Sequence, residues 1–503
     1  MAFRKVVNLT VLVAALPGTA QTPTVHLDPW VFHRDFSQAS LPVGMGRLGL
    51  AGFSLLRDGP GGFYLGPSLQ AALRGERGGF FAAGLEGGLR AGLTPRLSVD
   101  GALFLGGGGG WSAPVGGGLM LRPRLGLVWE AGAARLGLGL AHLRFPNGEI
   151  RSTQAYVTWE RRFSTLRLTS LPTGAEPWWP AGVAVHLEPE SLELHLSRYE
   201  NPAGFYPYSR GDRSPTRELL GVTWRHLGQG PFFYQVAASA AARGGTAGYM
   251  EVLGGVGARR FLDSGQRWAL RATLSAGSGG GGGIGTGGGF LVKAEAGLQY
   301  QVTPALHLFL EAGRVAAPSV PLRATTFSVG TGFTLGSVTP GRDPDAAPVP
   351  EPSALQWRVS SGFQRYASVP RRQGEPAGPL EQFAFKGEVL LTDSFYLTAQ
   401  SAWATGGGAG AWATGFLGLG AQTPAFHGHR LRVELAAGGG GGGGVESQGG
   451  ALVQALAGWN WDASRSWGIH CMGGRVRAPQ GGLSTSVLEL GLSFRGIHPV
   501  VFR

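Results

Sequence analysis

One series of landmark residues occurs three times along the chain, in the same order and at nearly constant spacing. A Phe-Tyr pair, a glycine run, a large aromatic residue, a proline and a phenylalanine follow one another, and each recurs after about 160 to 170 residues. Five landmarks would not stay in register by chance, so the sequence predicts three copies of one unit of about 161 residues. The landmarks are Phe63-Tyr64, Phe233-Tyr234 and Phe395-Tyr396; glycines 106–110, 279–283 and 438–444; Trp129, Tyr300 and Trp461; Pro146, Pro318 and Pro479; and Phe163, Phe333 and Phe494.

Within each unit, polar and apolar residues alternate with a period of two. In the segment 430–435, the charged residues Arg430, Arg432 and Glu434 alternate with Leu431, Val433 and Leu435. This pattern is typical of β-strands that have one polar and one apolar face. We expect about eight strands per unit and about 24 in all, of the 9 to 11 residues that cross a bilayer. In the first unit they are expected near 30–40, 47–57, 62–74, 78–92, 96–106, 117–130, 135–145 and 152–164.

Glycine is abundant, with 89 of 503 residues, and there are 32 prolines. This content approaches that of disordered chains, but 43% of the residues are hydrophobic and 10% are aromatic, so the chain must bury apolar surface. We expect the glycine runs to form mobile surface hairpins. Gly126, Gly297 and Gly458 lie within strands, where the missing side chain would let a neighbour approach closely.

The first 20 residues have the pattern of a secretory signal peptide. Arg4 and Lys5 precede an apolar stretch, and the small residues Gly18 and Ala20 follow it. The only cysteine, Cys471, cannot form a disulfide within the chain. No apolar run reaches the 18 residues of a membrane-spanning helix. We therefore expect an exported protein that has neither membrane-spanning helices nor disulfides within the chain.

The connections between the expected strands alternate in length. Short turns, such as the one around Pro95 and the one around Pro304, alternate with the glycine runs and with a longer segment at 201–216. Aromatic residues fall at the short-turn end, as in the interfacial girdle of membrane barrels. The predicted girdle consists of Phe63, Tyr64, Trp129, Phe163, Phe233, Tyr234, Tyr300, Phe333, Phe395, Tyr396, Trp461 and Phe494.

In these features the chain after Ala20 resembles the Gram-negative outer-membrane β-barrel proteins, at the level of class. The resemblance rests on the export signal, the alternating strands, the unequal turns and a last strand that ends at Phe494. It implies an outer-membrane location, with outer-membrane lipid and the barrel assembly machinery as partners. In that class an aromatic residue usually ends the chain, whereas here residues 495–503 follow Phe494, and Phe502 is the aromatic residue nearest the end.

Eight strands per unit could close into one all-β, antiparallel barrel of about 24 strands or into three tandem eight-stranded barrels. Proline-rich junctions favour separate barrels, whereas a single ring removes every sheet edge at once. We expect the single ring and keep the three small barrels as the alternative. The expected division is a signal peptide at 1–20, repeats at 21–170, 182–336 and 354–496, linkers or long turns at 171–181 and 337–353, and a tail at 497–503.

If the polar faces line a lumen, seven charged residues are candidates for it, and arginine is in excess among them. Such a lumen would favour anionic solutes, although a network of internal ion pairs would give the same pattern. The candidates are Arg96, Asp100, Arg267, Arg271, Arg430, Arg432 and Glu434.

Other chemistries find little support in the sequence. The basic residues, which give a formal charge of +12, are scattered rather than gathered as nucleic-acid binding requires. His427 and His429 lack further metal ligands nearby. The segment around His142 resembles a strand of the outer-membrane lipid A deacylases, but no serine lies within reach of this histidine. We expect no enzyme activity, no cofactor and no metal.

The sequence thus favours an outer-membrane barrel that acts as a channel or export pore for an anionic solute or a polymer. Two alternatives remain. One is a closed barrel that is structural or adhesive and displays glycine-rich loops, and the other is a soluble secreted array of β-domains.

Overall fold

The computed structural model describes residues 25–110, 112–132, 134–168, 184–201, 216–228, 230–341, 352–372 and 375–501. The expected signal peptide at 1–20 and the linker at 171–181 lie outside these residues. Among them there is no helix that is long and apolar enough to cross a membrane.

The described residues form 24 β-strands that pair only in antiparallel fashion, as the sequence predicts. They are joined in three successive sets of eight, which we call barrel 1, barrel 2 and barrel 3. Barrel 1 contains β1 (Val25–Ser40), β2 (Arg47–Asp58), β3 (Phe63–Gly75), β4 (Phe81–Gly92), β5 (Leu97–Gly109), β6 (Leu119–Ala131), β7 (Ala134–Arg144) and β8 (Arg151–Leu168), with one helical turn, η1 (Pro60–Gly62), before β3.

Barrels 2 and 3 have the same succession of strands. Barrel 2 contains β9 (Val185–Glu200), β10 (Thr216–Leu227), β11 (Phe232–Arg243), β12 (Met250–Phe261), β13 (Trp268–Gly280), β14 (Phe290–Gln301), β15 (Leu306–Ala316) and β16 (Arg323–Pro340). Barrel 3 contains β17 (Ser353–Val369), β18 (Gly378–Leu390), β19 (Phe395–Gly406), β20 (Ala413–Gln422), β21 (His429–Gly441), β22 (Ala451–Trp461), β23 (Trp467–Arg477) and β24 (Ser484–Val501).

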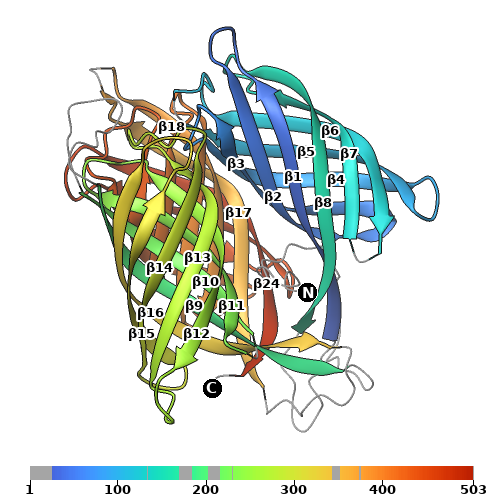
Figure 1. The fold of residues 1–503 in the computed structure, drawn as a ribbon, viewed down its shortest axis with the longest axis vertical. Coiled ribbons are helices and arrows are strands. Elements are labelled where there is room, and N and C mark those ends of the chain that lie inside the picture. The colour runs from blue at the N-terminus through green and yellow to red at the C-terminus, as the bar shows by residue number, and fades with distance from the viewer. Residues whose placement is uncertain are drawn as a thin grey trace.

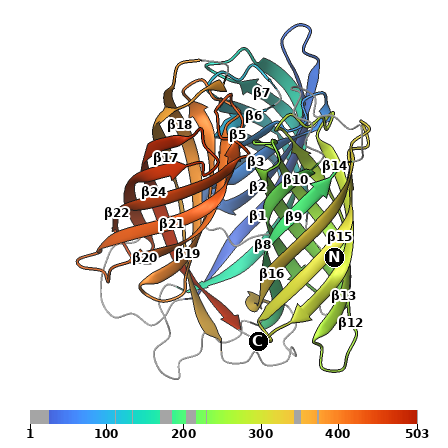
Figure 2. The ribbon, with the colours of Figure 1, turned by 90° about the vertical axis from the view of Figure 1, so that its left-hand side faces the viewer.

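The expectation of one ring of 24 strands is wrong, because the first and last strands of each set pair with each other. Strand β1 pairs with β8, β9 with β16 and β17 with β24, so that Trp30 lies opposite Phe163 and Val359 opposite Phe494. Each set of eight therefore removes its own edges by closing on itself. Figure 1 shows barrel 1 in blue to teal beside barrel 2 in green and yellow, and Figure 2 shows barrel 3 in orange and red.

The six strands that close the barrels are longer than the others, with 16 to 18 residues against 10 to 13. They extend beyond the barrels at the end where each barrel begins and ends, the lower end in Figures 1 and 2. There Leu168 pairs with Ile497, and Gly336 with Val501. His498 of barrel 3 joins the other two barrels: its Nδ1 lies 3.0 Å from the Leu166 carbonyl, and its Nε2 lies 2.6 Å from the Ser337 hydroxyl. The closing strands thus form a junction of the three barrels.

These extensions change the boundaries expected for the second and third repeats. Strand β16 runs to Pro340 rather than ending at 336, and β24 runs to Val501 rather than ending at 496. The segment 497–501, expected as a tail, is strand because it pairs with β17 and contacts the other barrels. Phe502 lies outside the described residues.

At the opposite end of the barrels, glycine-rich segments of neighbouring barrels touch. The turn after β3 contacts the β13–β14 loop, with the Gly78 amide 2.7 Å from the Gly287 carbonyl oxygen. The turn after β19 contacts the β5–β6 loop, with the Gly410 amide 3.0 Å from the Gly116 carbonyl oxygen. The turn after β11 contacts the end of β21 at Gly441 and the start of the β21–β22 loop at Gly442. In each contact, the turn after the third strand of one barrel meets the region that follows the fifth strand of the next barrel. The three contacts therefore close into a ring. The glycine runs, expected to be mobile surface hairpins, lie in these contacts between the barrels.

Candidate functional sites in and between the barrels

Apolar and polar side chains alternate along the strands, so that each barrel has an apolar outer face and a polar inner face. In β21, Leu431, Val433 and Leu435 are 64%, 55% and 69% exposed on the outer face. Between them Arg432 and Glu434 are each 2% exposed on the inner face. This is the pattern that the sequence predicts for strands facing lipid on one side.

The interior of barrel 1 is filled by a network of ion pairs. Arg90 lies 2.8 Å from Glu160 and 3.0 Å from Asp100, and Arg124 lies 2.5 Å from Glu86. All three carboxylates are at most 1% exposed. A charge buried this deeply is stable only when it is paired, so the network is part of the packing of the barrel.

Barrel 2 has an equivalent network around two glutamates. Arg271 lies 2.9 Å from Glu193 and 2.6 Å from Glu311. Arg225 lies 3.1 Å from Glu193, and His307 lies 3.0 Å from the same carboxylate. These groups come from β9, β10, β13 and β15, and their ion pairs therefore connect strands across the lumen.

In barrel 3 the network is centred on Arg432 and Lys386. Arg432 pairs with Glu388 and lies 2.8 Å from Glu434, and Lys386 lies 2.9 Å from both Glu434 and Glu489. An eight-stranded ring is just wide enough for its own side chains. Among the described residues, the charges inside all three barrels are therefore packed against each other rather than lining an open lumen.

The seven charged residues predicted to line a lumen fall into three groups. Asp100, Arg271, Arg432 and Glu434 lie in the interior networks. Arg430 is partly buried at the short-turn end of barrel 3, 3.2 Å from Asp462. Arg96 and Arg267 are exposed in short turns just before β5 and β13, so they do not face an interior.

Most of the carboxylates in the networks were not singled out from the sequence, although a signal for them exists. Glu86, Glu193 and Glu311 each lie between two apolar or glycine neighbours within a strand, at positions where the alternation points inward. This pattern of neighbours is visible in the sequence for all three glutamates. Their partners come from distant strands, and the sequence alone does not show which charges meet.

The residues predicted for an aromatic girdle differ in their exposure on the outer face. Phe63, Trp129, Phe333, Phe395 and Trp461 are 38% to 59% exposed on the outer face. Phe163, Tyr234 and Tyr300 are half-buried, and Tyr300 packs against Trp268 with ring centroids 4.8 Å apart.

Tyr64, Phe233, Tyr396 and Phe494 do not belong to the girdle. Tyr64 and Tyr396 point inward, where their hydroxyls lie 3.0 Å from Asp100 and Glu434, and Phe233 is also buried beside Arg225. The reason is geometric: successive side chains of a strand point to opposite faces, so a Phe-Tyr pair cannot place both rings outside. Phe494 is 3% exposed, because it packs between Trp357 and Trp467.

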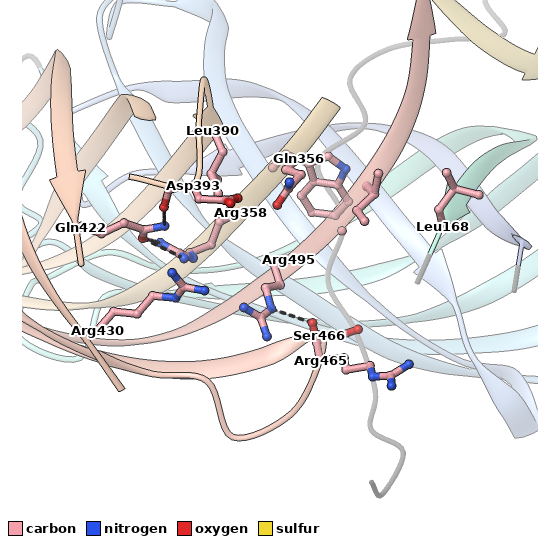
Figure 3. A pocket seen from close by; sticks show the side chains of 13 residues that line it. Leu168, Gln356, Arg358, Leu390, Asp393, Gln422, Arg430, Arg465, Ser466 and Arg495 are labelled. Atoms are coloured by element: carbon pink, nitrogen blue, oxygen red, sulfur yellow. Dashed lines mark hydrogen bonds between the residues drawn. The ribbon is translucent and has the colours of Figure 1, made fainter. Parts of the chain in front are cut away.

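An arginine-rich pocket, which we call the vestibule, lies at the short-turn end of barrel 3. Its volume is about 200 Å³, and Figure 3 shows Arg358, Arg430, Arg465 and Arg495 around it. Arg430 and Arg495 share the carboxylate of Asp462. Cationic groups therefore outnumber the carboxylates at the vestibule, a setting that attracts anions.

Two of the histidines singled out from the sequence contact neighbouring side chains. His429 accepts a hydrogen bond from the indole of Trp459 at 3.0 Å, and His427 lies in the preceding turn. His142 contacts Thr153 on the exposed face of barrel 1. His33, Asp35 and Glu86 lie close enough to share an ion, but Arg122 and Arg124 already pair with the two carboxylates and would repel a cation.

Comparison with known proteins gives structural resemblances but no family. No protein-family model matches the chain, and no curated protein matches it. The chain resembles solved Gram-negative outer-membrane β-barrels. One is the ferric enterobactin receptor PfeA of Pseudomonas aeruginosa, at 10% identity over 95% of this chain and 82% of that chain, with a TM-score of 0.29. Another is OccK8 (OprE) of the same organism, at 9% identity over 94% and 98%, with a TM-score of 0.22. OccAB4 of Acinetobacter baumannii gives 8% identity, 93% and 98% coverage and a TM-score of 0.22. At these TM-scores no site can be transferred from them.

Proposed function

We propose that the chain is an outer-membrane protein whose three barrels are closed, and that it is a structural unit of the cell envelope that displays glycine-rich loops. The observation that carries this proposal is the packing of each interior by buried ion pairs, such as Arg271 with Glu193 and Glu311. The exposed leucines on the outer faces support a membrane location, because they would meet lipid. Outer-membrane lipid and the barrel assembly machinery are the partners that this proposal implies.

The ends of the barrels support one orientation. Because each barrel has an even number of strands, it begins and ends on the same side, and this is the side of the short turns. In outer-membrane barrels the short turns face the periplasm and the longer loops face outward. The junction at His498 would then lie on the periplasmic side, and the glycine contacts on the outer side.

A channel that favours anionic solutes is the second candidate, and the vestibule of barrel 3 is the observation that favours it. An anion drawn there by Arg430 and Arg495 would have to pass the pair of Arg358 and Glu388, whose charged atoms lie 2.9 Å apart. Export of a polymer would need a much wider lumen than an eight-stranded ring encloses.

Two measurements test the closed-barrel proposal. We expect the protein in the outer-membrane fraction, with faster gel migration when it is not boiled, as folded barrels show. In planar bilayers we expect no stable conductance steps from this folded form. Recovery in the aqueous fraction without detergent would refute the membrane location.

Conductance steps would refute the closed state and support the second candidate. In that case the matched substitutions Arg358→Gln and Arg96→Gln distinguish an effect on the pore from an effect of surface charge. A pore through barrel 3 would lose anion selectivity with the first, whereas the exposed turn residue Arg96 would leave it unchanged.

A further inference from the structure

The strongest feature outside the barrel interiors is a cavity between the barrels, which we call the central cavity. Its volume is about 440 Å³, within the range of cavities that bind apolar ligands. Residues from all three barrels line it, including Phe81 of barrel 1, Val222 and Ala238 of barrel 2, and Trp403 and Leu417 of barrel 3.

The side chains that line the central cavity belong mainly to the outer, apolar faces of the barrels. In β10, Val222 lies between Gly221 and Thr223, which face the interior of barrel 2. In β11, Ala238 and Ala240 flank the inward-facing Ser239. The cavity is therefore bounded by surfaces that would meet lipid hydrocarbon if each barrel stood alone.

One end of the central cavity is closed by protein. The cavity is lined there by glycines of the ring contacts, including Gly79, Gly109 and Gly441. A Cβ atom on Gly441 would lie 2.2 Å from the Gly248 nitrogen, so the backbones touch without side chains between them. Beside this contact Phe81 and Trp403, 1% and 6% exposed, pack in a cluster with Ala71 and Ala83. A lipid chain cannot enter from the loop end.

Water is a poor occupant of this space. A buried water molecule needs two to four polar partners. The charged residues that touch the cavity wall, Lys386 and Glu251, face the barrel interiors, where Lys386 pairs with Glu434 and Glu489, and Glu251 accepts hydrogen bonds from two tyrosines. An apolar chain suits most of this wall, whereas a charged headgroup would find no charged partner in it apart from Lys386 and Glu251, which are already paired.

We propose that the central cavity binds an acyl chain of a phospholipid that enters from the short-turn side. This inference rests on the membrane location proposed above. With the loop end closed, the accessible source is the periplasmic leaflet, which consists of phospholipid. The bound chain would fill the space between the barrels and contact all three of them.

The test measures lipid retained by the full chain purified from outer membranes in a mild detergent. We expect native mass spectrometry to show one phospholipid per chain. Ala238→Trp and, as a second variant, Ala240→Phe would fill the cavity and reduce this retention at least fivefold. Ala296→Trp is the matched control, because Ala296 is exposed on the outer face of β14 in the same barrel.

The inference is overturned if the wild-type protein retains no phospholipid or retains lipid A instead. It is also overturned if the folded Ala238→Trp and Ala240→Phe variants keep as much phospholipid as Ala296→Trp. Heat-modifiable migration of each variant shows that its barrels are folded. A folded outer-membrane protein without bound phospholipid would leave the closed-barrel function intact, so the two proposals can fail separately.

Discussion

Arg271→Met is expected to destabilise barrel 2 strongly. The side chain of Arg271 is fully buried and pairs with Glu193 and Glu311, and its guanidinium also lies 3.8 Å from the ring centre of Phe309. Methionine replaces the apolar stem of the arginine side chain but carries no charge. Glu311 is then left paired only with Arg225, at 3.6 Å. Removing one partner of a buried ion pair typically lowers the free energy of unfolding by about 3 to 5 kcal/mol. Urea unfolding in detergent, followed by loss of the fast-migrating folded form, measures this change.

Arg267→Met provides the matched control, because Arg267 is exposed in the turn before the same strand. We expect it to change the free energy of unfolding by at most about 0.5 kcal/mol. The double variant Arg271→Met with Glu311→Gln removes the carboxylate that lost its main partner, so its loss should be smaller than that of Arg271→Met alone. Equal stability of Arg271→Met and Arg267→Met would mean that the interior is hydrated rather than packed.

Local features of the fold were predictable from the sequence because they depend on alternation within a strand. The expected strand at 47–57 is β2 (Arg47–Asp58), and the expected faces of 430–435 are those observed. Gly126, Gly297 and Gly458 also behave as expected. A Cβ atom on Gly297 would lie 2.0 Å from the Leu310 carbonyl oxygen, and one on Gly458 would lie 2.1 Å from that of Cys471.

The number of rings was not predictable in the same way. Alternation shows that β8 has an apolar face, but it does not show whether β8 pairs with β1 or with β9. That choice depends on pairs such as Trp30 with Phe163, which are far apart in the chain. The same limit applies to the interior networks, where Arg124 meets Glu86 across the barrel.

The glycine runs illustrate a second limit. A residue without a side chain suits both a mobile hairpin and a close contact between backbones, and composition does not distinguish the two. Whether a glycine run is mobile or forms a contact depends on which residues of the neighbouring barrel lie opposite it. Gly109 is opposite Gly410, and Gly441 is opposite Gly248. These pairs become visible only when the three barrels are placed together.

The ring of glycine contacts leads to the second prediction, which concerns Gly441→Leu. Its backbone does not need a left-handed conformation, so the expected effect comes from contact alone. A Cβ atom there would lie 2.2 Å from a backbone nitrogen of barrel 2, and the rest of leucine has no space at this interface. Because backbone cannot move aside as a flexible side chain can, we expect barrels 2 and 3 to separate at the loop end while each stays folded.

A disulfide between the two barrels reports this separation. A Cβ atom on Gly439 of barrel 3 would lie 3.7 Å from the Cβ of Ala240 of barrel 2, the spacing of a disulfide. It would also lie 2.9 Å from the Ala241 carbonyl oxygen, a much smaller overlap than the 2.2 Å at Gly441. In a Cys471→Ser background, Gly439→Cys with Ala240→Cys should cross-link nearly completely on oxidation. Adding Gly441→Leu should reduce the yield at least fivefold, with folded barrels still seen as heat-modifiable migration. Gly254→Leu is the control, since a Cβ atom at Gly254 meets nothing within 4 Å, and it should leave the yield unchanged. Full cross-linking with Gly441→Leu would show that the barrels are held together by the junction at His498 and not by the glycine contacts.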